Sequence, residues 1–318
     1  MDHDLVIRAV CLYWPLLVLV GLALWLRPGY FARVGVMLGL VWNLAVLPIV
    51  SSLAVELGWW EFRTDGPAVL GMPLELYFGW AVWWGGVMPL MGMAFLKRSA
   101  FGYLLLVILV AGVVDVLVMP QLEPVVGLAS GWWWGEGLLL GAVLMPGALL
   151  VWWTAKRRFL VGRILVQAGA FSVGLFLLVP CLESGGWGWL EDGFAGRPGW
   201  MMEGFVVMAI FLGTFGGAAV WEFGKRGGGT PVPFDPPVRL VTTGIYGHVA
   251  NPMQLAMTGL LLLWGIWFGS LWLLVLAGLA VVYSEGLARW SEREDHRERF
   301  GEAWAEYRKR VSRWRWRC

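Results

Sequence analysis

The stretch GTPVPFDPPVRLVTTGIYGHVANPMQ, residues 229–254, is a polar segment rich in glycine and proline. Long apolar runs lie on both sides of it in the sequence. Irregular backbone is tolerated at membrane depth only where protein or water satisfies its polar groups. The stretch is therefore predicted to be a structured loop that lines a functional site.

The composition around this loop is that of a membrane protein. The chain has 318 residues, of which 59% are hydrophobic and only 14% are charged, against roughly 25% charged residues in an ordinary soluble domain. Its mean hydropathy is +0.68. A helix needs about 20 mostly apolar residues to cross a bilayer. The sequence predicts an all-α polytopic protein with about nine transmembrane segments, at 9–26, 34–54, 76–96, 101–119, 138–155, 160–181, 203–222, 255–268 and 270–290.

Charges in the predicted loops alternate in sign. Basic residues fill one set of loops and acidic residues the intervening set, and lysine and arginine prefer the cytoplasmic side. This pattern predicts an external N-terminus and a cytoplasmic C-terminus, and the expected setting is a bacterial cytoplasmic membrane. The start of the chain, MDHDLVIRAV, lacks the basic region of a signal peptide, so the first apolar run is expected to be retained. The last two segments, joined at residues 268–270, are expected to form a tight helical hairpin.

Several classes of function are disfavoured by the sequence. Three cysteines and three histidines show no metal-ligand spacing, so no metal is expected. The basic residues follow the expected membrane surface, which argues against binding of nucleic acid. Two domains are predicted: residues 1–200, with about six spans, and residues 201–318, which contain the loop and a cytoplasmic tail from 285 to 318.

The tail is predicted to contain an amphipathic helix. Its apolar residues recur at helical spacing, and the basic residues after Tyr307 give it positive charge. One interpretation places this helix on anionic lipid of the inner leaflet. The other has it cover a cytoplasmic site. The residues of the apolar face are Phe300, Trp304, Tyr307, Val311 and Trp314.

The loop and the tail together resemble a known family. TGIYGHVANPMQL, residues 243–255, contains most of the pattern G-x-Y-x-x-V-R-[HN]-P-M-Y-L of the isoprenylcysteine carboxyl methyltransferases, which are related to bacterial phospholipid N-methyltransferases. SEREDHRERFGEAWAEYRKRV, residues 291–311, resembles the tail of the same family. The resemblance covers about residues 200–315. It implies a membrane-embedded methyltransferase that uses S-adenosylmethionine and takes a lipid or isoprenoid substrate from the bilayer.

The resemblance also implies roles for individual residues. It assigns His248 and Asn251 to catalysis, with His248 as the base that an amine or phenol acceptor would need; a carboxylate acceptor would need none. Glu292 is expected to hold the ammonium or the ribose of the cofactor. The residues implied to bind the cofactor are Gly244, Tyr246, His248, Val249, Asn251, Pro252, Leu255 and Glu292.

Three positions depart from the family pattern. Ala250 stands in place of the motif arginine, Gln254 in place of the final tyrosine, and Arg293 in place of the second acidic residue of the tail. The loss of the arginine removes a fixed positive charge, which Arg293 or Arg239 would have to replace in space. An alternative function is therefore a catalytically silent membrane protein that keeps the pocket and serves in binding or assembly.

The N-terminal part offers weaker signals. The segment from Trp59 to Trp80 is similar to part of the membrane lycopene cyclase domains, with Glu75 as the corresponding acid. This suggests an isoprenoid-modifying enzyme with a cyclase-like first half as a further alternative. Asp115 lies inside an apolar span, and such carboxylates are either functional or reach water near a span end. Glu222 ends the seventh span beside the loop and either faces the site or is an interfacial charge.

Overall fold

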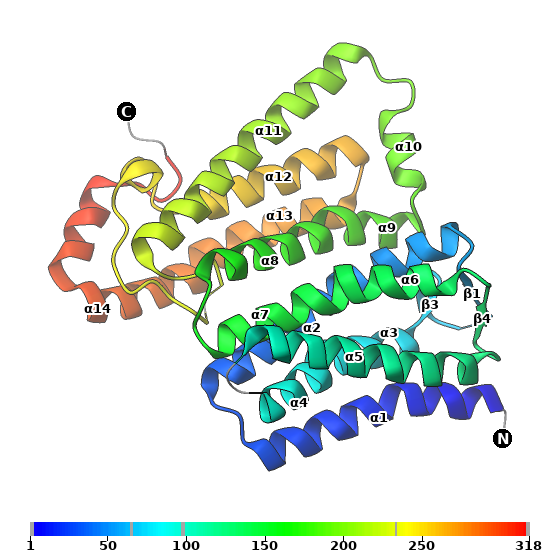
Figure 1. Cartoon of the computed structure of the whole chain (residues 1–318). Coiled ribbons are helices and arrows are strands. Elements are labelled where there is room, and N and C mark those ends of the chain that lie inside the picture. Colours follow the sequence, from blue (N-terminus) through cyan, green and yellow to red (C-terminus); the bar gives the residue numbers. More distant parts are fainter. Residues whose placement is uncertain (1–2, 64–65, 97–98, 233, 316–318) are drawn as a thin grey trace. The chain divides into compact units, whose positions relative to one another are not determined.

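The computed structural model describes residues 3–63, 66–96, 99–232 and 234–315, apart from the side chains of residues 3, 287 and 291–293. The described chain is almost entirely helical, as predicted (Figure 1). Six helices are long and apolar enough to cross a membrane: Asp4–Leu26, Tyr30–Glu56, Ala100–Leu122, Trp132–Ala155, Leu160–Ser184 and Gly199–Gly227. Pro252–Phe268 and Leu271–Gly286 are shorter apolar helices. The remaining predicted segment, 76–96, also lies within helices. The protein is therefore a polytopic all-α membrane protein.

The chain divides into two compact units, Met1–Leu178 and Val179–Cys318. The predicted domain roles, separated near residue 200, stay a prediction. The first unit consists of α1 (His3–Leu26), α2 (Tyr30–Glu56), α3 (Leu74–Val82), η1 (Trp83–Val87), α4 (Met88–Phe95), α5 (Ala100–Val118), η2 (Met119–Leu122), α6 (Trp132–Leu139), η3 (Leu140–Leu144), α7 (Met145–Ala155), α8 (Leu160–Val173) and η4 (Gly174–Leu178). Two short antiparallel pairs join its loops, β1 (Trp60–Phe62) with β4 (Val126–Leu128), and β2 (Ala68–Val69) with β3 (Met72–Pro73).

Helix α2 is the centre of the first unit, where it packs against α3, η1, α7 and α8. Small residues allow this close approach. A Cβ atom on Gly39 would lie 2.7 Å from the carbonyl oxygen of Gly85, and a Cβ on Gly85 would lie 2.7 Å from that of Gly39. Backbones this close are typical of membrane helix packing. Around them lies one large cluster of buried apolar residues contributed by helices α2 to α7.

Three prolines explain irregular turns in the spans. Pro89, Pro146 and Pro180 each follow a π-helical segment, respectively η1, η3 and η4. In the first two cases the residue before the proline bonds five positions back, Met88 to Trp83 and Met145 to Leu140. A proline removes one helical donor and crowds the preceding turn, so a wider turn relieves the clash. All three prolines therefore lie beside local π-turns.

The second unit holds the predicted loop. Its elements are α9 (Val179–Ser184), α10 (Gly188–Phe194), α11 (Gly199–Glu222), η5 (Phe223–Gly227), η6 (Gly244–Gly247), α12 (Pro252–Phe268), α13 (Leu271–Tyr283), η7 (Ser284–Ala288) and α14 (Arg289–Arg310). Helix α12 packs on both α11 and α13, and the loop and α14 lie at one end of these helices (Figure 1).

The predicted helical hairpin is confirmed between α12 and α13. Gly269 ends α12 in the left-handed conformation, with φ of 69°, which glycine adopts without steric cost. Ser270 begins α13 and caps it, because its hydroxyl accepts a hydrogen bond from the Leu273 amide at 3.3 Å.

Candidate functional site

The loop between η5 and α12 is ordered by its own backbone. The amide of Thr230 donates to the carbonyl of Asp235 at 3.0 Å, and the amide of Val238 donates to Gly227 at 2.8 Å. Thr230 and Asp235 are themselves buried. Buried backbone groups need such partners, because an orphan in a low-dielectric setting is costly. The loop is thus a fixed element that can position side chains.

Glu222 ties the end of α11 to the start of the motif. Its carboxylate accepts from Arg226 Nε at 2.8 Å and from the Thr243 hydroxyl at 3.3 Å. The next residue, Gly244, has a φ of +58°, and a Cβ there would lie 2.6 Å from Glu222 Oε1. The positive φ favours glycine at this position, and a side chain there would also have to displace the Glu222 carboxylate. Glu222 thus contacts the start of the motif, but it is not among the residues that line the cavity described below.

Tyr246 holds the motif against α11 and the tail. Its hydroxyl donates to the carbonyl of Ala219 at 3.4 Å, while its own carbonyl accepts from the Tyr307 hydroxyl at 2.8 Å. Burial raises the pKa of Tyr246 above its usual value, with smaller contributions from Tyr307 and Glu222. The phenol therefore stays neutral and acts as a fixed hydrogen-bond donor.

The tail covers the loop. Ala250, Tyr307 and Val311 form a buried cluster against which Leu240 and Trp304 pack. The Ala250 amide also donates to the carbonyl of Ser312 at 2.9 Å. The predicted single tail helix is kinked, since Gly301 within α14 has a φ of 52° and a ψ of −126°. Much of the apolar face assigned to the tail is thus buried on protein, which matches the alternative that the tail covers a site.

A cavity of about 190 Å³ lies between loop and tail. Its walls are mostly apolar and aromatic, and Asn251, Gln254 and His296 are among its polar residues. His296 lies close to Trp304, with ring centroids 4.7 Å apart. The lining residues are Phe223, Pro237, Leu240, Val241, Tyr246, Ala250, Asn251, Met253, Gln254, His296, Trp304 and Tyr307.

Arg313 stands behind the polar end of the cavity. The side chain is 6% exposed, and its Nε donates to the Ser284 hydroxyl at 3.2 Å. A guanidinium carries only donors, so the amide oxygen of Asn251 faces it, at 2.8 Å from Nη2 and 3.1 Å from Nε. Ser284 in turn donates to Gln254. The guanidinium of Arg313, which also pairs with Glu285 Oε1 at 3.6 Å, therefore brings a cation of the tail against Asn251 of the motif.

The predicted site residues occupy different places. Tyr246 and Asn251 line the cavity. Three others shape the loop and are not among the residues that line the cavity. Gly244 contributes its backbone conformation, Val249 is a fully buried side chain, and Pro252 is the first residue of α12. Leu255 is partly buried in α12. Glu292 belongs to α14, and its side chain lies outside the described residues.

His248 is exposed and is not among the residues that line the cavity, although sequence reasoning selected it as the base. The lining histidine is His296, which sequence reasoning passed over. The missed signal was its spacing, since His296 precedes Phe300 and Trp304 by four and eight residues. Arg313 was missed because its predicted role was in a basic surface. Within the described part of the chain, no cluster of three or more His, Cys, Asp and Glu residues could hold a metal ion.

The apolar helices define a polytopic membrane protein. In its second unit, the loop and the tail enclose a small cavity. Residues 204–303 match the sequence model of the phospholipid methyltransferase family. This match confirms the resemblance seen in the loop and tail, and it supports a membrane methyltransferase in general. No curated protein and no solved structure matches the chain.

Proposed function

We propose that the protein is an integral membrane methyltransferase that uses S-adenosylmethionine to methylate a lipid or isoprenoid-linked acceptor, with a carboxylate as the favoured group. The observation that carries this proposal is the cavity between the family-matched loop and the tail, with Tyr246 and Asn251 in its wall. The proposed setting is a bacterial cytoplasmic membrane, with the cavity on the cytoplasmic side.

The chemistry of the cavity wall suits this cofactor. Bound S-adenosylmethionine would supply an electrophilic methyl group on a sulfonium centre. The faces of Trp304, Tyr246 and Phe223 suit a cation and a flat aromatic ring. Asn251, at the start of α12, stands where helix amides favour an anion, and Arg313 adds positive charge behind it. A carboxylate group of the ligand is therefore best held at the Asn251 end.

The residues of the cavity constrain the acceptor. A carboxylate acceptor is already nucleophilic and needs only positioning and the exclusion of water, which the apolar wall favours. An amine or hydroxyl acceptor would need a base, and His296 is the lining residue of that chemical type. The base therefore belongs to α14 in this proposal, in place of His248 in the loop.

The acceptor is proposed to enter from the bilayer along α11. This helix buries only Phe205 and Ala219 among its described residues and exposes large apolar side chains such as Ile210 and Phe211. Lys309 and Arg310 are exposed on the tail and are the residues proposed to contact anionic lipid. Such contact would be electrostatic, because the apolar side chains of Tyr307 and Val311 are buried against Ala250 and are not available to lipid.

The first test is calorimetric binding of S-adenosylmethionine and S-adenosylhomocysteine to the full chain in detergent. Trp304→Leu and Asn251→Ala are expected to weaken binding at least about tenfold, since each removes a wall of the cavity. Trp290→Leu is the matched control, because Trp290 is 61% exposed. Folded wild-type protein that binds neither compound would contradict the proposal and favour the silent binding or assembly role.

A pair of histidine variants tests the base. If the acceptor is an amine or hydroxyl, His296→Ala should lower methyl transfer about 100-fold or more with little change in cofactor affinity, while His248→Ala keeps activity. With a carboxylate acceptor, neither variant should change the turnover by more than a few-fold. A large loss confined to His248→Ala would restore the assignment made from the sequence.

A further inference from the structure

Two acidic side chains lie together inside the first unit. Asp115 is 1% exposed and Glu136 is 5% exposed, and the two carboxyl groups are close enough to interact electrostatically. Asp115 ends the buried stripe of α5, after Tyr103, Val107 and Ala111. Both residues belong to helices long and apolar enough to cross a membrane. Burial of a carboxyl at such a place is costly, so it calls for a compensating group.

The surrounding protein leaves this pair without ordinary hydrogen bonds. Neither oxygen of Asp115, nor Oε1 of Glu136, has a hydrogen-bond partner among the described residues. The indoles of Trp80 and Trp84 lie next to the Asp115 carboxyl without reaching bonding geometry. Arg8 on α1 pairs with Glu75 at 2.8 Å. The negative charge of the pair is thus uncompensated by these groups.

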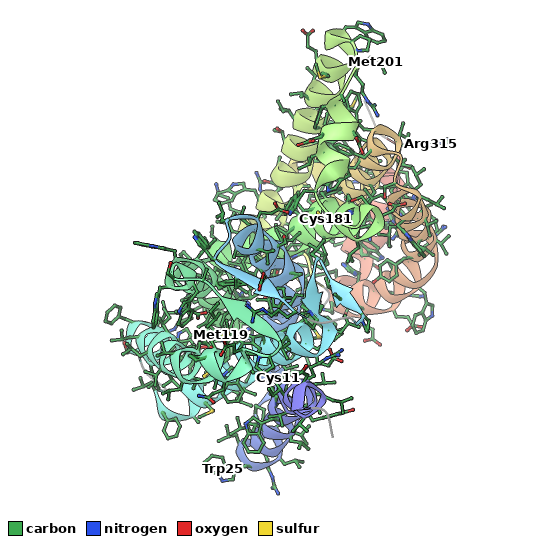
Figure 2. All side chains as sticks on the ribbon, turned by 90° about the vertical axis from the view of Figure 1, so that its right-hand side faces the viewer. Cys11, Trp25, Met119, Cys181, Met201 and Arg315 are labelled. Carbon is green, nitrogen blue, oxygen red and sulfur yellow. The ribbon has the colours of Figure 1, made fainter. Side chains whose placement is uncertain are left out.

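Asp115 opens onto a cavity of about 180 Å³ between α1, α3 with η1, and α5. Three tryptophans line this cavity, namely Trp14, Trp80 and Trp83, and the remaining walls are almost entirely apolar. Trp14 is 60% exposed on α1, a helix whose surface is largely uncovered by protein. A ligand could therefore enter from the lipid phase. Figure 2 labels Cys11, which lines the cavity and marks this part of the unit.

We propose that this cavity binds the cationic head of an amphiphile, an alkylammonium group whose chain stays in the bilayer. Two neighbouring carboxyl groups in a low-dielectric setting require a proton or a cation beside them. Indole faces attract cations, most of all compact ammonium groups. The apolar wall favours an organic cation over a hydrated metal ion, and the site is independent of methyl transfer in the second unit.

The test measures equilibrium binding of radiolabelled dodecyltrimethylammonium to the full chain in maltoside micelles, with uncharged dodecanol as the matched probe. Wild type should bind one equivalent of the ammonium saturably, and much more tightly than dodecanol. Asp115→Asn should weaken ammonium binding at least about tenfold. Glu56→Gln, which changes an exposed carboxyl of the same unit, should leave it unchanged.

Trp14→Leu provides an independent arm, because the exposure of Trp14 lets the variant fold normally. It should weaken the ammonium about threefold or more and leave dodecanol unaffected. Equal affinity of wild type for the two probes would overturn the proposal. So would unchanged ammonium binding in folded Asp115→Asn or, should that variant fail to fold, in Trp14→Leu. No S-adenosylmethionine is used, so failure of the proposed methyltransferase function would not affect this result.

Discussion

The two units use similarly apolar sequences in different ways. The first packs its helices on one another around a single large core and brings backbone against backbone at Gly39 and Gly85. In the second, α11 buries little, and two small buried clusters gather about the loop. In Figure 2, side chains project outward along the end of α11 marked by Met201. Apolar composition alone therefore does not tell whether a helix faces protein or lipid.

Buried polar groups differ between the units as well. In the second unit Arg313, Ser284, Asn251 and Gln254 form a connected network. In the first, the oxygens of Asp115 have no such partners among the described residues. A satisfied network rigidifies a site, whereas an unsatisfied buried group calls for a ligand or a proton. The polar network of the second unit is satisfied by its own side chains. The Asp115 carboxyl of the first unit instead needs a bound ligand or a proton.

The largest expected effect comes from filling the contact between α2 and η1. Gly39→Leu would place a Cβ 2.6 Å from Val151 Cγ2 and 2.7 Å from the Gly85 oxygen, so backbone must move. We expect a loss of more than about 3 kcal/mol, seen as a lower thermal midpoint in detergent. Gly217→Leu on α11, where a Cβ would have no neighbour within 4 Å, should change stability by less than about 1 kcal/mol. Equal losses of stability in the two variants would contradict the inference that α2 is closely packed on protein while α11 is not.

The next effect concerns the departure at Ala250. Ala250→Arg restores the family residue, yet it forces a long charged side chain against Tyr307 and Val311. We expect destabilisation of about 2–3 kcal/mol and weaker cofactor binding, because the tail would be displaced. Ala250→Ser should cost less than the arginine. If methylation first appeared with Ala250→Arg, Arg313 would not be supplying the missing charge, and the silent-pocket hypothesis would be favoured.

Sequence reasoning predicted the helices well because apolar length is a local property. The hairpin at Gly269 followed from a short polar break, and the meeting of loop and tail followed from two ordered motifs. The choice of His248 rested on its proximity in sequence to the motif, and the structure leaves this side chain outside the lining of the cavity. The position of Arg313 depends on the turn at Gly301 and on the extended end of the tail, which no periodicity reveals.

A smaller effect is expected at the hydrogen bond that joins tail to loop. Tyr307→Phe removes the donor to the Tyr246 carbonyl and leaves that buried oxygen without its partner. The expected cost is about 1–2 kcal/mol, with a matching loss of affinity for S-adenosylmethionine. Tyr283→Phe changes a phenol that is 50% exposed and should be neutral. A neutral Tyr307→Phe would show that apolar packing alone holds the tail.

The smallest effect compares one helix cap from each unit. Ser99 caps α5 through a 3.1 Å bond from the Gly102 amide in an exposed setting, whereas Ser270 caps α13 from a buried one. Both alanine variants should lower stability, Ser99→Ala by about 0.5 kcal/mol and Ser270→Ala by about 1–2 kcal/mol. Water can replace the lost partner at Ser99 but has poor access at Ser270, so chemical unfolding of the two variants should rank them in that order. The reverse order would mean that the hairpin end of the second unit is wetter than its burial indicates, because water would then replace the lost cap at Ser270 as readily as at Ser99.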